Sequence, residues 1–191
     1  MHALLHSGSA FRRSTVPLLV PAMLTALALA GCSGLPGYVK DQADLSCPKV
    51  GIVRGANMVT LFGPGPGRKP VDVVGRGLIA DYSGNCTYDN SGVTVDVSLA
   101  LVGERGPATT GGPLPLTYFV AVSAPDGTVV TKQEFSTTID FTSGGPRAGS
   151  REDLSPHIPL PKGQNAGGYQ LLVGFQLTPE QLDYNRRSET K

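Results

Sequence analysis

The stretch GVTVDVSLALV, residues 92–102, decides the fold class of this chain. Its larger apolar side chains fall at every second position: Val93, Val95, Val97, Leu99 and Leu101. Thr94, Asp96 and Ser98 lie between them. Because successive side chains of a β-strand point to opposite faces, this alternation predicts a half-buried strand with one face in the core.

Shorter apolar stretches on both sides of this segment are predicted to be strands of the same domain. They are residues 49–54, 56–62 and 71–82 before it, and residues 114–124, 128–141 and 169–177 after it. Pro125-Asp126-Gly127 predicts a tight hairpin turn, because glycine supplies the positive φ angle that such a turn requires. We expect a turn over residues 83–90 and an irregular connection over residues 142–168.

Strands of this number and spacing predict an all-β fold, and an antiparallel β-sandwich is the most economical arrangement. An immunoglobulin-like or fibronectin-like Greek key is the first expectation and a small barrel the second. Residues 158–161 (IPLP), followed by Tyr169, resemble the tyrosine corner of immunoglobulin-like sandwiches. An aromatic residue that only marks a strand end is the other interpretation.

The C-terminal part of the chain carries a helix signal. In Thr178-Pro179-Glu180-Gln181, the threonine suits the N-cap, proline the first helical position and glutamine the third, as in a capping box. We expect a helix of a turn or two through Tyr184, then a polar tail over residues 186–191. The predicted sandwich domain therefore covers residues 47–185.

The N-terminal part of the chain has the features of an export signal. Arg12 and Arg13 precede an apolar run over residues 16–30, which is shorter than the ~20 residues that a membrane-spanning helix needs. The run ends in Leu29-Ala30-Gly31-Cys32, which resembles the signal of bacterial lipoproteins. A secretory signal followed by a chance cysteine is the alternative.

The lipoprotein resemblance has consequences for location. It implies a signal peptide over residues 1–31, cleavage between Gly31 and Cys32, and a diacylglycerol on the Cys32 sulfur that anchors the protein in membrane lipid. Ser33 stands where an aspartate commonly retains lipoproteins at the inner membrane, which favours the outer membrane with the domain facing the periplasm. Residues 32–46 would be the tether. The whole sequence also resembles uncharacterised periplasmic lipoproteins of proteobacteria.

The other two cysteines, Cys47 and Cys86, are then the only pair left in an oxidising compartment, and we expect a disulfide between them. A redox pair usually has closer spacing. A zinc site would need more ligands than these cysteines and His157, which is the only histidine after residue 31. No metal site or cofactor is therefore expected.

The charge balance and the motifs argue against several functions. Without Arg12 and Arg13 of the predicted signal peptide, 14 of the 16 basic side chains remain against 15 acidic ones, and no basic cluster is larger than the pairs Arg68-Lys69 and Arg186-Arg187, so a nucleic-acid partner is not expected. Gly63-Pro64-Gly65-Pro66-Gly67 lacks the spacing of a phosphate-binding loop, and its prolines remove amide donors. It is interpreted as a surface loop.

Catalysis is not expected either. The chain has no G-x-S-x-G or H-E-x-x-H motif, and a catalytic triad would depend on His157 alone. Neighbouring Glu152 and Asp153 could supply a carboxylate pair, but their adjacency says nothing about a cleft. A calcium site could be drawn from the acidic and amide residues of one region, although solvated turn residues are the favoured interpretation. Those residues are Asp81, Asn85, Asp89, Asn90 and Asp96.

These observations favour a membrane-anchored, non-catalytic binding or assembly module of a cell-envelope complex. A sandwich has sheet edges, and such edges commonly bind an extended partner segment as an added strand. The expected partner is another envelope protein. The alternative is a periplasmic carrier or sensor of a small apolar ligand held between the sheets.

Overall fold

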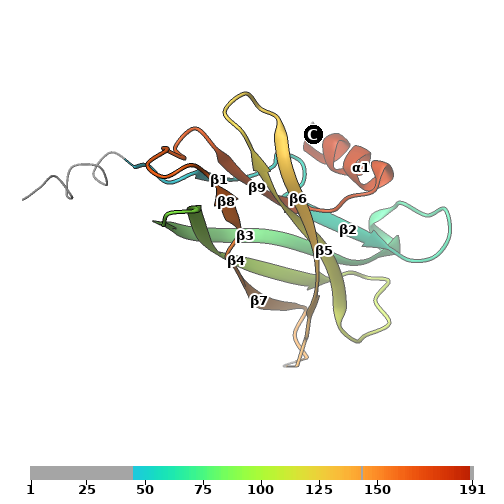
Figure 1. Ribbon diagram of the computed structural model, residues 1–191. Coiled ribbons are helices and arrows are strands. Elements are labelled where there is room, and N and C mark those ends of the chain that lie inside the picture. Colours follow the sequence, from blue (N-terminus) through green and yellow to red (C-terminus); the bar gives the residue numbers. More distant parts are fainter. Residues whose placement is uncertain (1–44, 143, 190–191) are drawn as a thin grey trace, which may run out of the picture. The chain divides into compact units, whose positions relative to one another are not determined.

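The computed structural model describes residues 45–142 and 144–189. The predicted signal peptide, Gly31, Cys32 and the tether up to residue 44 lie outside the described residues. The described part is an all-β sandwich with one short C-terminal helix, which confirms the predicted fold class (Figure 1). The immunoglobulin-like or fibronectin-like assignment stays a prediction.

The two sheets have different strand orders. The first contains β1 (Lys49–Ile52), β9 (Gln170–Phe175), β5 (Leu114–Ser123) and β6 (Val129–Ile139), in that order. The second contains β2 (Met58–Phe62), β3 (Val73–Tyr88), β4 (Gly92–Arg105) and β7 (Arg147–Leu154), and β8 (His157–Pro159) also pairs with β4. A short 3₁₀ helix, Pro70–Asp72, precedes β3.

The core lies between the inner faces of the two sheets. The five alternating apolar side chains of residues 92–102 are at most 2% exposed in β4, as the pattern predicts. Leu171, Val173 and Phe175 of β9 face them and are at most 1% exposed. In β3, Gly77 lies under Leu116 of β5, and a Cβ at this position would come within 2.7 Å of the leucine side chain. A glycine here lets the sheets approach.

Two of the sequence predictions about irregular segments were wrong. Residues 83–88 continue β3, which pairs with β4 as far as Tyr88 opposite Val93, so the turn is confined to residues 89–91. Residues 142–168 contain β7 and β8. The inner face of β7 carries Ala148, Ser150, Glu152 and Leu154. An edge strand that is half covered can fold without an apolar run, so no apolar pattern marked this strand in the sequence.

The sandwich also departs from a purely antiparallel arrangement. β1 pairs with β9 in parallel, with Val50 opposite Leu171. All other strand pairs of the described residues are antiparallel. A parallel pair needs a long connection, and here almost the whole domain lies between the two strands. Local turn signals therefore could not predict it.

The C-terminal helix α1 (Pro179–Glu189) begins as predicted and ends later than predicted. Thr178 Oγ1 accepts from the Gln181 amide at 3.2 Å and the Thr178 amide donates to Gln181 Oε1 at 2.9 Å, which confirms the capping box. Beyond the expected end, Asn185 Nδ2 donates to the carbonyl oxygens of Gly55 (2.9 Å) and Met58 (2.7 Å). Within the described residues, no helix has the length and apolarity to cross a membrane.

Candidate functional site

The strongest candidate site is the open flank between β6 and β7. These strands follow each other in the chain, but they lie at the edges of different sheets. β6 is paired on one side only, by β5, and β7 on one side only, by β4. Each strand therefore has a second side whose backbone groups form no ladder with another described strand, and both face the same flank of the sandwich (Figure 1).

A polar cluster closes one end of this flank. Thr137 of β6 donates from Oγ1 to Glu152 Oε1 of β7 at 2.6 Å, and Ser150 Oγ donates to the same oxygen at 3.2 Å. The Tyr118 hydroxyl of β5 lies 3.4 Å from Glu152 Oε2, to which it donates. Glu152 is half-buried, and its hydrogen bonds link β7 of one sheet to β5 and β6 of the other.

The cluster affects the ionisation of Tyr118. Burial and, to a smaller extent, the neighbouring Glu152 carboxylate together raise the pKa of Tyr118 to about 12. The phenol therefore remains protonated near neutral pH and keeps its hydrogen bond to Glu152. The Tyr118 ring also stacks on Phe135 of β6, with 5.4 Å between the ring centroids. Phe135 connects the cluster to the open part of the flank.

Beyond Phe135 the flank contains a hollow of about 280 Å³. Its apolar floor is formed by Val120 and Val122 of β5, which are 6% and 2% exposed. Residues of β6, of the end of β7 and of the segment that follows it form its walls: Thr131, Gln133 and Phe135 from β6, Asp153 and Leu154 from β7, and then Ser155 and Pro156. The hollow thus offers an apolar contact directly beside the unpaired side of β6.

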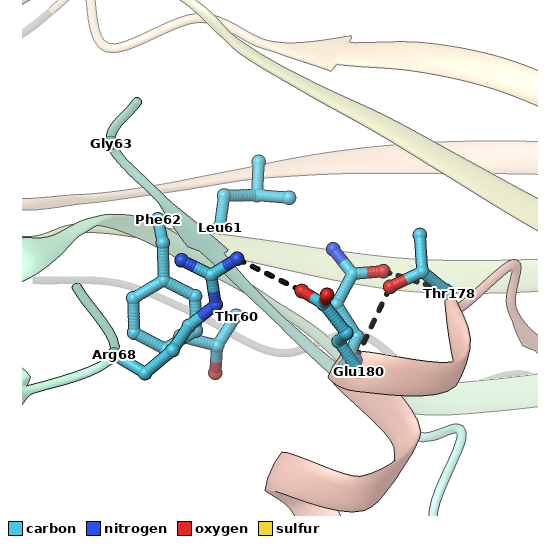
Figure 2. Close-up of a pocket in the computed structure, with 8 residues that line it drawn as sticks. Thr60, Leu61, Phe62, Gly63, Arg68, Thr178 and Glu180 are labelled. Carbon is cyan, nitrogen blue, oxygen red and sulfur yellow. Dashed lines mark hydrogen bonds and ion pairs between the residues drawn. The ribbon is translucent and has the colours of Figure 1, made fainter. Parts of the chain in front are cut away.

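A second concave region lies beside the start of α1. Arg68 stacks over Phe62, and its Nη2 lies 2.9 Å from Glu180 Oε2 (Figure 2). Nη1 donates to the carbonyl oxygens of Gly65 (3.0 Å) and Gly67 (2.8 Å). The arginine joins the glycine-proline loop to the helix. Its donors are engaged within the chain, so this hollow of about 250 Å³ is the weaker candidate.

The predicted cysteine pair is joined in the structure. Cys47 and Cys86 form a disulfide with 2.00 Å between the sulfur atoms, and it connects the start of the domain to β3. The Tyr88 hydroxyl strengthens this connection, because it donates to Ser46 O and accepts from the Ala166 amide. Tyr88 thus ties distant segments of backbone together. For Tyr169 a tyrosine corner and a plain strand-end aromatic were both open, and among the described residues its hydroxyl makes no hydrogen bond of the kind that a tyrosine corner needs.

The candidate calcium residues do not converge. Asp89 Oδ1 accepts from the Ser91 hydroxyl (2.6 Å) and from the amides of Ser91 and Gly92. The Ser91 hydroxyl is the main cause that lowers the pKa of Asp89. Asp96 lies across the strand pair from Asn85 and accepts from Ser155 instead. Within the residues that the structure describes, no group of three or more histidine, cysteine, aspartate or glutamate side chains could hold a metal ion.

The candidate catalytic residues are likewise separate. Adjacent positions of β7 point to opposite faces, so Glu152 faces the other sheet and Asp153 faces outward. His157 lies between Thr94 Oγ1 (3.2 Å) and Ser91 Oγ (3.4 Å), and the Ser91 hydroxyl is directed to Asp89. In a catalytic triad the histidine stands between serine and acid, and here it does not.

The cluster around Glu152 was not predicted from the sequence as a structural unit. Its members come from β5, β6 and β7, and the last of these was interpreted as irregular chain. The available signal was the alternation of Ala148, Ser150, Glu152 and Leu154, which is too polar to suggest a core-facing strand. Comparison with protein-family models finds none that matches this chain, and comparison with curated proteins finds no match either.

Proposed function

We propose that this protein is a lipid-anchored, non-catalytic binding module of the bacterial cell envelope. The Leu29-Ala30-Gly31-Cys32 motif supports the anchor, with Cys32 as the acylated residue and the outer membrane as the location. Two or three acyl chains give stable membrane attachment where one chain is marginal. The domain beyond the tether acts close to the membrane surface and binds another envelope protein.

The open flank carries the binding part of the proposal. An extended partner segment adds to the unpaired side of β6 through backbone hydrogen bonds, and one of its apolar side chains enters the hollow over Val120 and Val122. In this mode the backbone bonds supply affinity and the hollow supplies specificity. The hollow of about 280 Å³ is large enough for one apolar side chain and lies just below the ~300–1,000 Å³ that is typical of small-ligand sites.

The test is photo-crosslinking in living cells with the full-length protein. A photoreactive amino acid replaces Thr131, which lines the hollow, or Asn85, which is exposed on the other sheet. We expect a discrete protein adduct from position 131 and none from position 85, followed by its identification by mass spectrometry. A lipid adduct at position 131 would support the carrier of a small apolar ligand instead, and no adduct would contradict binding at this flank.

The anchor is tested separately. Wild-type protein grown with radioactive palmitate is expected to be labelled and to sediment with the outer membrane. Cys32→Ser should be unlabelled and should accumulate as the uncleaved precursor. Labelling of Cys32→Ser would refute the lipoprotein assignment without bearing on the flank.

A further inference from the structure

The middle of β6 has a charge pattern that is complementary to itself. Lys132 and Glu134 lie on the outer face of the sheet, where Lys132 contacts Gln176 of β9 (2.6 Å) and the ring of Phe119. Lys132 Nζ also lies 3.2 Å from Glu134 Oε1 of the same strand, and the two side chains are 39% and 50% exposed, so a second copy of the strand can still reach both charges. Thr131, Gln133 and Phe135 alternate with them and line the hollow on the inner face. One basic and one acidic residue thus flank Gln133 symmetrically.

This symmetry specifies a register for a second copy of the strand. When two β6 strands run antiparallel with Gln133 opposite Gln133, each Lys132 faces Glu134 of the other copy. Directly opposite residues of antiparallel strands have Cβ atoms ~4.5–5.5 Å apart, close enough for both ion pairs to form. A twofold axis through this point makes the interface isologous, the commonest symmetry among protein dimers.

The same register covers apolar surface that the single chain leaves exposed. Val129 and Val130 are 56% and 57% exposed at the start of β6. Val129 and Val130, where the pairing of β6 with β5 shifts register, lie beside Ser136 and Thr137 of the second copy in the paired arrangement. On the inner face, Phe135 of each copy lies beside Thr131 of the other, at the edge of the hollow.

We propose that β6 pairs antiparallel with β6 of a second copy, with Gln133 at the twofold axis, and that the two four-stranded sheets become one continuous sheet. The occupant of the unpaired side of β6 is then another copy of this chain. This inference rests on the proposed function and names its partner, because the extended segment that adds to the unpaired side of β6 is β6 of the second copy.

Charge exchange gives the test. Full-length copies with two different epitope tags are co-expressed, and co-isolation from detergent extracts measures pairing. Lys132→Glu leaves two acidic residues on each strand and Glu134→Lys leaves two basic ones, so each variant should pair at least about tenfold less with itself than wild type does. A mixture of the two single variants restores both ion pairs and should co-isolate as wild type does. So should the double exchange Lys132→Glu/Glu134→Lys with itself.

Recovery in the mixture also shows that the single variants are folded. Undiminished self-pairing of either single variant, or failure of the mixture to pair, would overturn the proposed dimer.

Disulfide trapping in cells provides the geometric test. Gln133→Cys places one thiol opposite its own symmetry mate and is expected to give a dimer on a non-reducing gel. Thr131→Cys is the matched control, because its two symmetry-related copies would lie about 13 Å apart along the strands and should not react. Equal dimer yield from both variants would contradict the register.

The photo-crosslinking experiment at position 131 and the disulfide trapping together distinguish this inference from the proposed function. Capture of a different envelope protein at β6, without the dimer, overturns the inference and leaves the proposed function standing. If neither the dimer nor another crosslinked protein forms, the result contradicts both the inference and the proposed function.

Discussion

The Tyr88 hydroxyl donates a hydrogen bond to the carbonyl oxygen of Ser46 across 2.6 Å, although the residues are 42 positions apart in the chain. The Tyr88 hydroxyl oxygen in turn accepts a hydrogen bond from the Ala166 amide at 2.8 Å. One side chain therefore holds the first residues of the domain and the segment before β9 together, next to the Cys47–Cys86 disulfide. A pull on the proposed lipid anchor would act on the chain at this point.

Tyr88→Phe removes both hydrogen bonds and leaves the Ala166 amide without its partner. We expect the free energy of unfolding to fall by about 1–3 kcal/mol, as measured by urea denaturation. Tyr82→Phe is the matched control, because the Tyr82 hydroxyl makes one bond, to Val50 O, and the residue is 39% exposed. It should lower the stability by less. Equal losses would mean that the phenolic hydroxyl of Tyr88 has no special role.

The disulfide should contribute more than either tyrosine. Cys47 and Cys86 are separated by 39 residues, and constraining a loop of this size in the unfolded chain is worth roughly 4 kcal/mol. The double variant Cys47→Ala/Cys86→Ala should therefore lose about this much stability. Addition of reductant to the wild-type protein should have a similar effect, whereas the double variant should not respond to it. A response of the variant to reductant would assign the effect to something else.

The raised pKa of Tyr118 leads us to expect that the stability of the folded protein falls at alkaline pH. Burial, and then Glu152, raises the pKa of Tyr118 to about 12 in the folded protein, above the ordinary value of 10.0. Between these values the unfolded chain releases the proton and the folded chain keeps it, so the free energy of unfolding falls as the pH rises. Denaturation at a series of pH values from 9 to about 12 should show this fall, and Tyr118→Phe should show less of it. An identical pH dependence in the variant would contradict the assignment.

The parts of this fold that have a local sequence pattern could be predicted from the sequence, and the parts that depend on distant residues could not. Strands whose inner faces are continuously apolar, such as β4, were evident from their alternation, and the turn at Gly127 was evident from its local sequence. In β7, Glu152 and Ser150 occupy inner positions, so no local pattern marked the strand. The pairing of β1 with β9, and the meeting of Tyr118 with Glu152, depend on residues far apart in the sequence.

Gly92 lies at the start of β4, directly after the turn that follows β3, and its backbone lies close to β8. Its φ angle is +150°, and a Cβ at this position would lie within 2.1 Å of the Ile158 carbonyl oxygen. The contact is with backbone, so no side-chain rotation can relieve it, and the β4–β8 pairing must shift. Gly92→Ala should lower the free energy of unfolding by several kcal/mol, the range of severe backbone and packing effects.

Gly51 of β1 is the matched control for Gly92, because a Cβ built there meets no atom within 4 Å. Gly51→Ala should leave the stability within about 0.5 kcal/mol of wild type or raise it, since alanine restricts the unfolded chain more than glycine does. Thermal and urea denaturation of the two variants would decide the matter. If Gly92→Ala were as stable as Gly51→Ala, the close approach of β8 to Gly92 would be wrong.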